Sequence, residues 1–199
     1  MGSAQQPSKV KLFLAILFRP EIEREGLLRE ITAFFGAVEF SHGPVPFTFS
    51  DYYRDEMGEG LLKRYMTFAP LVDRERLPGI KAVTNGIERS RLANGGRTVN
   101  LDPGYIARDK LVLATTKDFY HRLYLSEGIY GEVTLHFRKG AFRHFSWTYP
   151  DYKEASFQEF LMKARATYMH ETREGRPAPP PKSPRLRRGF GRQAAGGLL

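Results

Sequence analysis

The chain has 199 residues, a formal net charge of +9, 41% hydrophobic and 13% aromatic residues, and no cysteine. This composition is typical of a folded globular protein of one domain, and the lack of cysteine excludes disulfides, thiolate metal sites and a cysteine nucleophile. A cysteine-free chain also agrees with a cytoplasmic location. Six of the positive charges come from residues 175–199, which leaves only +3 for residues 1–174, so the charge of the folded part does not indicate a polyanionic partner.

Three segments are predicted. Residues 1–8 form a flexible leader, residues 9–174 form a single domain, and residues 175–199 form a basic tail rich in proline, arginine and glycine. The tail has too few apolar residues to offset the entropy cost of ordering, so we expect it to be disordered. The apolar run at residues 12–18 is far shorter than the roughly 20 residues of a membrane helix, and no cleavage site follows it. It is therefore predicted to be a buried strand, and no membrane partner is expected.

The first half alternates between strands and amphipathic helices. After a strand at residues 10–18, we expect a helix that begins at Pro20 and ends at Gly36, followed by a return strand from Val38. Residues 41–49 contain two prolines and a glycine, which predicts an edge strand or an extended loop. A strand at residues 63–69 and a second helix capped by Asp73 complete this half.

The second half is rich in strands. Asn94, Gly95 and Gly96 predict a break, after which a strand at residues 98–101, a turn at residues 102–104 and a strand at residues 111–116 are expected. Residues 129–137 and 142–147 predict a hairpin, and a closing helix follows a capping box at Ser156 and Glu159. The pattern predicts an α+β fold with a mixed or antiparallel sheet, helices on one side of it and a ferredoxin-like first half.

Several common catalytic motifs are absent from the sequence. No Gly-Lys pair is present, which excludes a P-loop. The sequence has two Gly-x-Gly pairs, and neither is followed by the third glycine of a dinucleotide fingerprint. There is no His-Glu-x-x-His zinc helix and no Gly-x-Ser-x-Gly elbow, and no metal site is predicted. The sequence indicates no particular cofactor and does not decide whether the protein is an enzyme.

Two polar groups are candidate ligand-binding residues. Asp102 begins the expected turn, where its carboxylate either caps the turn or binds a cation or a substrate hydroxyl. Lys117, His121 and Arg122 follow the next strand, and a helical turn there would bring the three side chains onto one face. They form either a solvated connection or a site for a phosphate or carboxylate.

Two further groups lie in the expected hairpin and after it. Strand alternation places Glu132 on a polar face, which is either solvent-exposed or, if covered, gives a general base together with His121. Trp147 and Asp151 belong to an aromatic segment that either packs the last helix or forms a wall of a ligand pocket. We predict that Asp102, His121, Arg122, Glu132 and Trp147 surround one concavity.

Five blocks of sequence, in order along the chain, resemble the domain-of-unknown-function family 4416. They comprise residues 47–58, 99–105, 110–122, 128–135 and 147–152. The resemblance covers roughly residues 9–170 and departs at Gly131, where alanine is expected. It implies a prokaryotic, stand-alone, soluble protein and no defined activity. Some relatives carry a GTP-binding label, but this chain has no P-loop, and its five-residue match at residues 99–103 to GPN-loop GTPases is a coincidence.

The sequence predicts binding of a small anionic ligand, phosphate-bearing and nucleotide-like, at Asp102, Lys117, Arg122, Trp147 and Asp151, with Glu132 and His121 as acid–base groups in the event of catalysis. The alternative is a non-enzymatic module that binds RNA or protein through the aromatic segments and the basic tail. In that case the tail would bind nucleic acid weakly and without sequence preference. The oligomeric state is not predicted.

Overall fold

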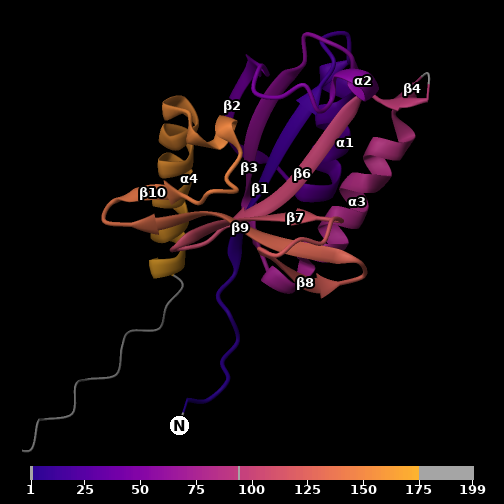
Figure 1. Cartoon of the computed structure of the whole chain (residues 1–199). Coiled ribbons are helices and arrows are strands. Elements are labelled where there is room, and N and C mark those ends of the chain that lie inside the picture. Colours follow the sequence, from indigo (N-terminus) through magenta and orange to yellow (C-terminus); the bar gives the residue numbers. More distant parts are fainter. Residues whose placement is uncertain (1, 94, 175–199) are drawn as a thin grey trace, which may run out of the picture.

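The computed structural model describes residues 2–93 and 95–174, so the predicted tail lies outside the described residues. Its first half is a β-α-β-β-α-β unit whose four strands pair antiparallel in the order β6-β1-β3-β2 (Figure 1). This is the ferredoxin-like arrangement, as predicted. The elements are β1 (Val10–Phe18), α1 (Arg24–Phe35), β2 (Val38–Pro46), β3 (Leu62–Val72), α3 (Leu77–Ser90) and β6 (Val99–Ile106). Smaller elements within it are α2 (Arg54–Met57), a 3-10 turn η1 (Arg74–Arg76), β4 (Leu92–Ala93) and β5 (Gly96–Arg97).

The second half extends the same sheet beyond β6. The added strands are β7 (Lys110–Thr115), β8 (Arg122–Ser126), β9 (Ile129–Arg138) and β10 (Ala141–His144), followed by a 3-10 turn η2 (Pro150–Lys153) and α4 (Ala155–Glu174). β9 pairs with β7 along one side and with β8 and β10 along the other. The predicted hairpin is confirmed, and its turn residues Lys139 and Gly140 both have positive φ, as a two-residue type I′ turn requires.

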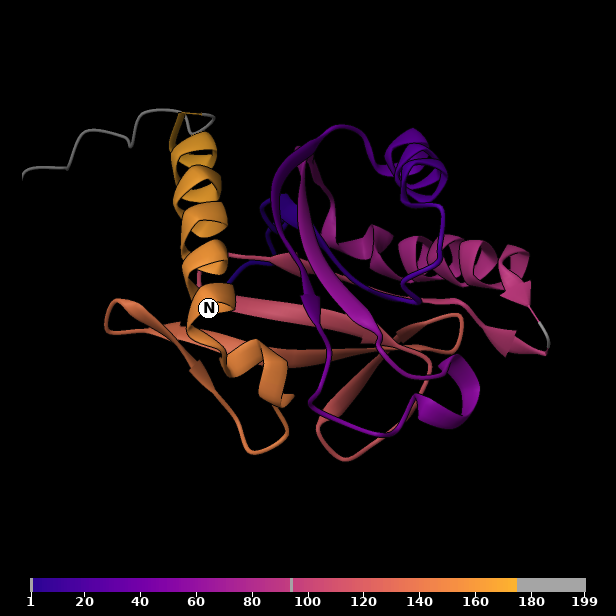
Figure 2. The ribbon, with the colours of Figure 1, turned by 90° about the horizontal axis from the view of Figure 1, so that it is seen from above.

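Helices cover both faces of the sheet. As a consequence, β1 is buried along its whole length and exposes neither face to solvent. Leu14 and its neighbours on the same face of β1 pack against α1 and α3, whereas Phe13 and Ala15 pack against η2 and α4. Figure 2 shows α4 separated from α1 and α3 by the strands. The expected placement of helices on one side holds for α1 and α3, while α4 lies on the opposite face. None of the described helices is both long and apolar enough to cross a bilayer.

Two helix starts differ from the prediction. Pro20 lies in a turn before α1, whose N-cap is Glu23, since its carboxylate accepts a hydrogen bond from the Gly26 amide. Asp73 makes no capping hydrogen bond to η1, which leads directly into α3. Both changes are local and leave the predicted apolar faces of the helices in place.

The predicted turn at residues 102–104 is wrong, because these residues lie inside β6. β6 pairs with β7 over only three residue pairs, which begin at Gly104 and Leu113. A Cβ atom on Gly104 would collide with the Val112 carbonyl and the Leu113 side chain, so glycine permits the close approach of the two strands. On the N-terminal side of Gly104 the strands separate, and Pro103 lies where β6 has no ladder with β7.

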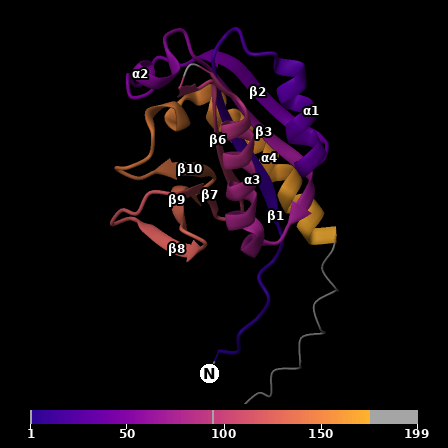
Figure 3. The ribbon, with the colours of Figure 1, turned by 90° about the vertical axis from the view of Figure 1, so that its right-hand side faces the viewer.

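The separation of β6 and β7 divides the molecule into its two halves. Figure 1 shows these strands diverging, and Figure 3 shows β8, β9 and β10 to one side of the ferredoxin-like half. The helix α3 packs against both β6 and β7 and so bridges the gap between them on one face of the sheet.

Candidate functional site

A cavity of about 450 Å³ lies where β6 and β7 separate. This volume is within the range of small-molecule sites. Because the strands do not pair here, side chains of α3 reach the cavity from the opposite face of the sheet. The remaining walls come from β6, from the end of β7 with the residues after it, from the β2–β3 connection, from η2, and from single residues of β3, β5 and β8. The polar lining residues used below are Lys63, Lys81, Glu88, Arg97, Asn100, Asp102, Thr115, Lys117, Arg122 and Asp151.

The floor of the cavity is a buried ionic network on α3 and β6. Lys81 Nζ donates a hydrogen bond to the Leu101 carbonyl (2.8 Å) and lies 3.5 Å from Asp102 Oδ1 and 3.9 Å from Glu88 Oε1. Glu88 in turn accepts a hydrogen bond from the Leu101 amide at 2.7 Å. Burial raises the pKa of Glu88 above its ordinary value, and the charge of Lys81 opposes that rise.

Arg97 fixes the orientation of the groups around Asp102. It binds the Glu56 carboxylate through two hydrogen bonds of 2.7 Å and donates to Asn100 Oδ1 at 2.6 Å. The Asn100 amide nitrogen therefore faces Asp102 and donates to its Oδ2 at 2.7 Å. The hydrogen bonds from Arg97 also lower the pKa of Glu56. The negative partner of this ion pair lies on α2.

A second buried ion pair lies under η2. Lys63 Nζ and the Tyr65 hydroxyl both donate to Asp151 Oδ2, at 2.5 and 2.6 Å. The ammonium group also lies 5.0–5.5 Å from the ring centres of Phe47, Tyr65 and Tyr152. Burial, followed by the charge of Asp151, raises the pKa of Tyr65, so this phenol stays protonated and acts as a donor.

Lys117 and Arg122 form the cationic end of the cavity. Arg122 donates from Nε to Glu132 Oε2 (2.9 Å) and from Nη1 to the Lys117 carbonyl (3.0 Å). Lys117 Nζ contacts the Tyr52 hydroxyl at 2.6 Å, and this hydrogen bond lowers the pKa of Tyr52. Among the described residues Lys117 has no carboxylate within 4.0 Å, unlike the other cations of the cavity lining.

Glu132, His121 and Trp147 lie behind Arg122 and do not line the cavity. Glu132 is buried and contacts His121 Nε2 at 3.0 Å as well as Arg122. The imidazole stacks on the Trp147 indole with ring centres 4.8 Å apart, and the indole donates to the Val133 carbonyl. These contacts hold the guanidinium of Arg122 in place. The predicted shared concavity is therefore corrected, since it contains only Asp102 and Arg122 of its five residues.

The reason for this correction is that neighbouring side chains engage Glu132 on the polar face of β9. Arg122 at the start of β8 pairs in register with Glu132, so the carboxylate is spent on its neighbours across the ladder. The expected helical turn is also absent, because β8 begins at Arg122 and residues 117–119 have no regular secondary structure. Lys117 and Asp151, also predicted, line the same cavity as Asp102 and Arg122.

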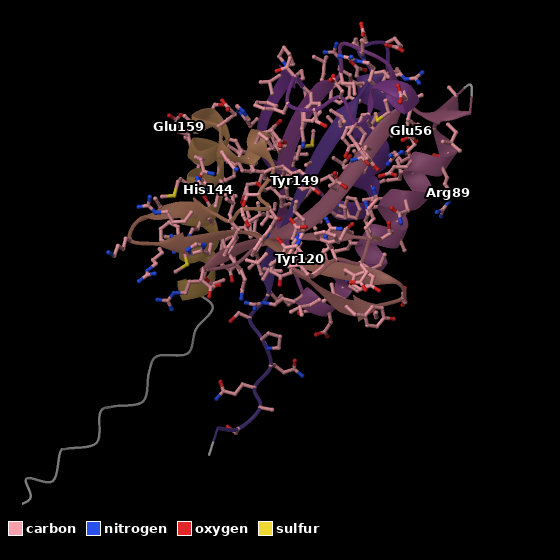
Figure 4. The ribbon with its side chains drawn as sticks, viewed as in Figure 1. Glu56, Arg89, Tyr120, His144, Tyr149 and Glu159 are labelled. Atoms are coloured by element: carbon pink, nitrogen blue, oxygen red, sulfur yellow. The ribbon has the colours of Figure 1, made fainter. Side chains whose placement is uncertain are left out.

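Sequence reasoning missed four charged residues of the cavity: Lys63, Lys81, Glu88 and Arg97. A signal was present for two of them, because Lys81 and Glu88 lie four and eleven residues after Leu77 and share its buried helix face. In the view of Figure 4, Tyr149 of the cavity wall lies between Glu56 on α2 and Tyr120 before β8. Within the described part of the chain, no group of three or more His, Asp and Glu side chains is placed to hold a metal ion.

Comparison with known proteins identifies a family for the chain. The family model described as "Domain of unknown function (DUF4416)" matches residues 8–168, a span that includes every strand, α1, α2, α3 and most of α4. No curated protein and no solved structure shows significant similarity to the chain. The match covers the whole sheet and every residue of the cavity, and the chain belongs to the DUF4416 family.

Proposed function

We propose that the cavity binds a small anionic organic molecule that carries a phosphate group, with nucleotides among the candidates. The observation that carries this proposal is the charge of the lining, where five cations face three carboxylates in a space of molecular size. The cations are Lys63, Lys81, Arg97, Lys117 and Arg122, and the carboxylates are Glu88, Asp102 and Asp151.

The phosphate is expected at Lys117 and Arg122. Among the described residues, the only polar side-chain partner of Lys117 is the Tyr52 hydroxyl. An anion can therefore replace this hydroxyl as the partner of Lys117 without breaking an ion pair. Arg122 is held by Glu132 and by a backbone carbonyl, which presents a preorganised guanidinium to the cavity. The hydroxyls of Thr115 and Thr116 line the same end and supply further donors.

A planar group is expected against the aromatic walls. The residues that line one side are Phe47, Phe49, Tyr52 and Tyr53, and Tyr149 lies directly before η2. Burial raises the pKa of Tyr53 and Tyr149, so both phenols remain neutral at physiological pH. Neutral rings around a cavity of this size favour stacking with a base or a similar ring. Binding is proposed without turnover, because Glu132 contacts Arg122, His121 contacts Glu132, and neither lines the cavity.

Thermal unfolding in the presence of AMP, GMP, ribose 5-phosphate and inorganic phosphate tests this function. Near-saturating ligand at about 100 times its Kd adds about 2.7 kcal/mol of stability, which raises the Tm by roughly 5–10 °C for a chain of this size. Arg122→Ala and Lys117→Ala are expected to lose most of this shift. The matched control is Arg143→Ala, which removes an exposed arginine of β10. The proposal fails if none of these compounds raises the Tm or if Arg122→Ala responds like the wild type.

A second candidate is RNA binding without catalysis, favoured by an exposed aromatic stretch beside Lys117. Phe119, Tyr120 and Tyr124 are 57, 77 and 62% exposed, and such rings can stack on unpaired bases. The tail that would assist lies outside the described residues. Binding of a single-stranded RNA as a function of salt separates the contributions. A Tyr120→Ala/Tyr124→Ala variant that binds RNA as the wild type does would exclude the aromatic stretch, and removal of residues 175–199 reports on the tail.

A further inference from the structure

The cavity has two chemically different ends. Asp102 lies on β6, whereas Lys117 and Arg122 lie beyond the end of β7, and the two strands diverge from Gly104. The Asp102 side chain is one-third exposed (33%) and lines the cavity. A bound molecule that reaches both ends therefore meets Lys117 and Arg122 at one end and, at the other, the Asp102 carboxylate with the Lys81 ammonium 3.5 Å away.

Asp102 retains capacity to accept hydrogen bonds from a bound molecule. Its Oδ2 accepts from Asn100, while Oδ1 lies 3.5 Å from the Lys81 ammonium, whose hydrogen bond goes to the Leu101 carbonyl. No described residue donates a hydrogen bond to Oδ1. An ionised carboxylate offers about four acceptor sites and no donor, so what it can bind is a donor such as a hydroxyl or amino group.

The orientation of Asp102 is fixed before any molecule binds. Glu56 holds Arg97, Arg97 holds the Asn100 oxygen, and the Asn100 nitrogen holds Asp102 Oδ2, each through hydrogen bonds of 2.6–2.7 Å. A carboxylate locked in this way rejects a second phosphate by charge repulsion and selects a hydroxyl by geometry.

We propose that Asp102 makes the cavity selective for phosphate monoesters with free sugar hydroxyls, such as ribose phosphates and ribonucleotides, over their deoxy forms and over bisphosphates. This inference rests on the proposed binding of a phosphate-bearing molecule at Lys117 and Arg122. It adds the class of that molecule: an anion at one end and a pair of hydroxyls at the other. Asp102 acts as a specificity-determining residue.

Calorimetric titration of the full chain tests this selectivity. The probes are ribose 5-phosphate with 2-deoxyribose 5-phosphate, AMP with 2′-deoxy-AMP, and fructose 1,6-bisphosphate. A hydrogen bond to a charged acceptor corresponds to tenfold or more in affinity, so each ribose compound is expected to bind at least about tenfold more tightly than its deoxy partner. Asp102→Asn should bring this ratio close to one and should strengthen binding of the bisphosphate.

The matched control is Asp109→Asn, which removes an exposed carboxylate before β7 and should leave the ratio unchanged. Should Asp102→Asn fail to fold, Asn100→Ala keeps the carboxylate but frees its orientation, and a smaller fall in the ratio is expected. A wild-type ratio near one, or a ratio unchanged in Asp102→Asn and Asn100→Ala, overturns the selectivity while binding of the phosphates still supports the proposed function. Absence of binding by all probes overturns both.

Discussion

Two lysines buried in the central strands lie in very different surroundings. Lys11 on β1 has no exposed side-chain surface and contacts Glu39 on β2 and Glu171 on α4 at 2.9–3.1 Å, away from the cavity. Lys63 on β3 pairs with Asp151 in the cavity wall. Both lysines are buried and ion-paired, but only Lys63 is within reach of a bound molecule. The comparison distinguishes ion pairs that only stabilise the packing of the strands and helices, such as those of Lys11, from an ion pair that also forms part of the cavity wall, such as that of Lys63.

The largest effect is expected where the first lysine loses both partners. The Glu39→Gln/Glu171→Gln double variant leaves Lys11 buried without a counter-charge, which should lower the free energy of unfolding by about 3 kcal/mol. Urea denaturation measures this change. Glu25→Gln, which breaks an exposed pair with Arg29, should cost less than about 1 kcal/mol. Because the Lys11 site is remote, the Tm shift produced by AMP should not change, and loss of that shift would contradict the separation of the two lysines.

Asp151→Asn should affect both stability and binding. The amide keeps a hydrogen-bonding group beside Lys63 and Tyr65 but removes the negative charge, so the expected loss of stability is about 2 kcal/mol. The same variant changes the cavity wall and should also weaken AMP binding. If the variant unfolds more easily yet binds AMP like the wild type, Asp151 contributes only to stability, as the partners of Lys11 do.

A third buried lysine, Lys81, sharpens the comparison because its partner Glu88 is itself buried. Burial raises the pKa of Glu88, so the folded protein binds a proton more tightly there than the unfolded chain does. The contribution of Glu88 to stability is therefore lost as pH rises from the ordinary value of 4.5 through the raised pKa. Urea denaturation from pH 4 to pH 7 should show wild type losing stability relative to Glu88→Gln. A flat or rising difference would contradict the raised pKa.

The smallest effect concerns an exposed lysine. Lys117 lowers the pKa of the exposed Tyr52 phenol through a hydrogen bond, so in Lys117→Ala that pKa should return toward 10.0. Ultraviolet titration detects the change, and Tyr52→Phe identifies the band that belongs to this tyrosine. The free energy of unfolding should not change measurably, because both side chains are solvent-exposed. An unchanged titration in Lys117→Ala would show that the contact does not persist in solution.

Local patterns predicted most of the fold. The apolar run at residues 12–18, the helical spacing of Leu27 and Ile31 and the hairpin before Phe142 each depend on neighbours in sequence, and all were found. The prediction of a turn at Asp102–Gly104 was wrong for a physical reason. Proline and glycine signal a break in strand pairing, and that break can be a turn or, as here, a close crossing of two strands. Only the position of β7 distinguishes the two.

The site was predicted only in part. Strand alternation identifies which side chains share a face of the sheet, but it does not reveal which residues contact that face. Glu132 lies on the predicted face of β9, but Arg122 of β8 and His121 just before that strand contact its carboxylate, so these groups support the cavity from behind. Lys63 and Arg97 reach the cavity through long-range packing that no spacing in the sequence reveals. Asp102, Lys117, Arg122 and Asp151 line one cavity, although Asp102 lies inside β6 and Asp151 in η2 and neither marks the end of a strand.

The close approach at Gly104 sets the point at which the cavity begins. β6 and β7 are joined by three residue pairs, and beyond them β6 remains paired with β1 and β7 with β9. Asn100 lies four residues from the close approach, about 13 Å at 3.3 Å per residue. A side chain at position 104 would force the strands apart at this point. The size of the opening is therefore governed by a residue that does not line the cavity.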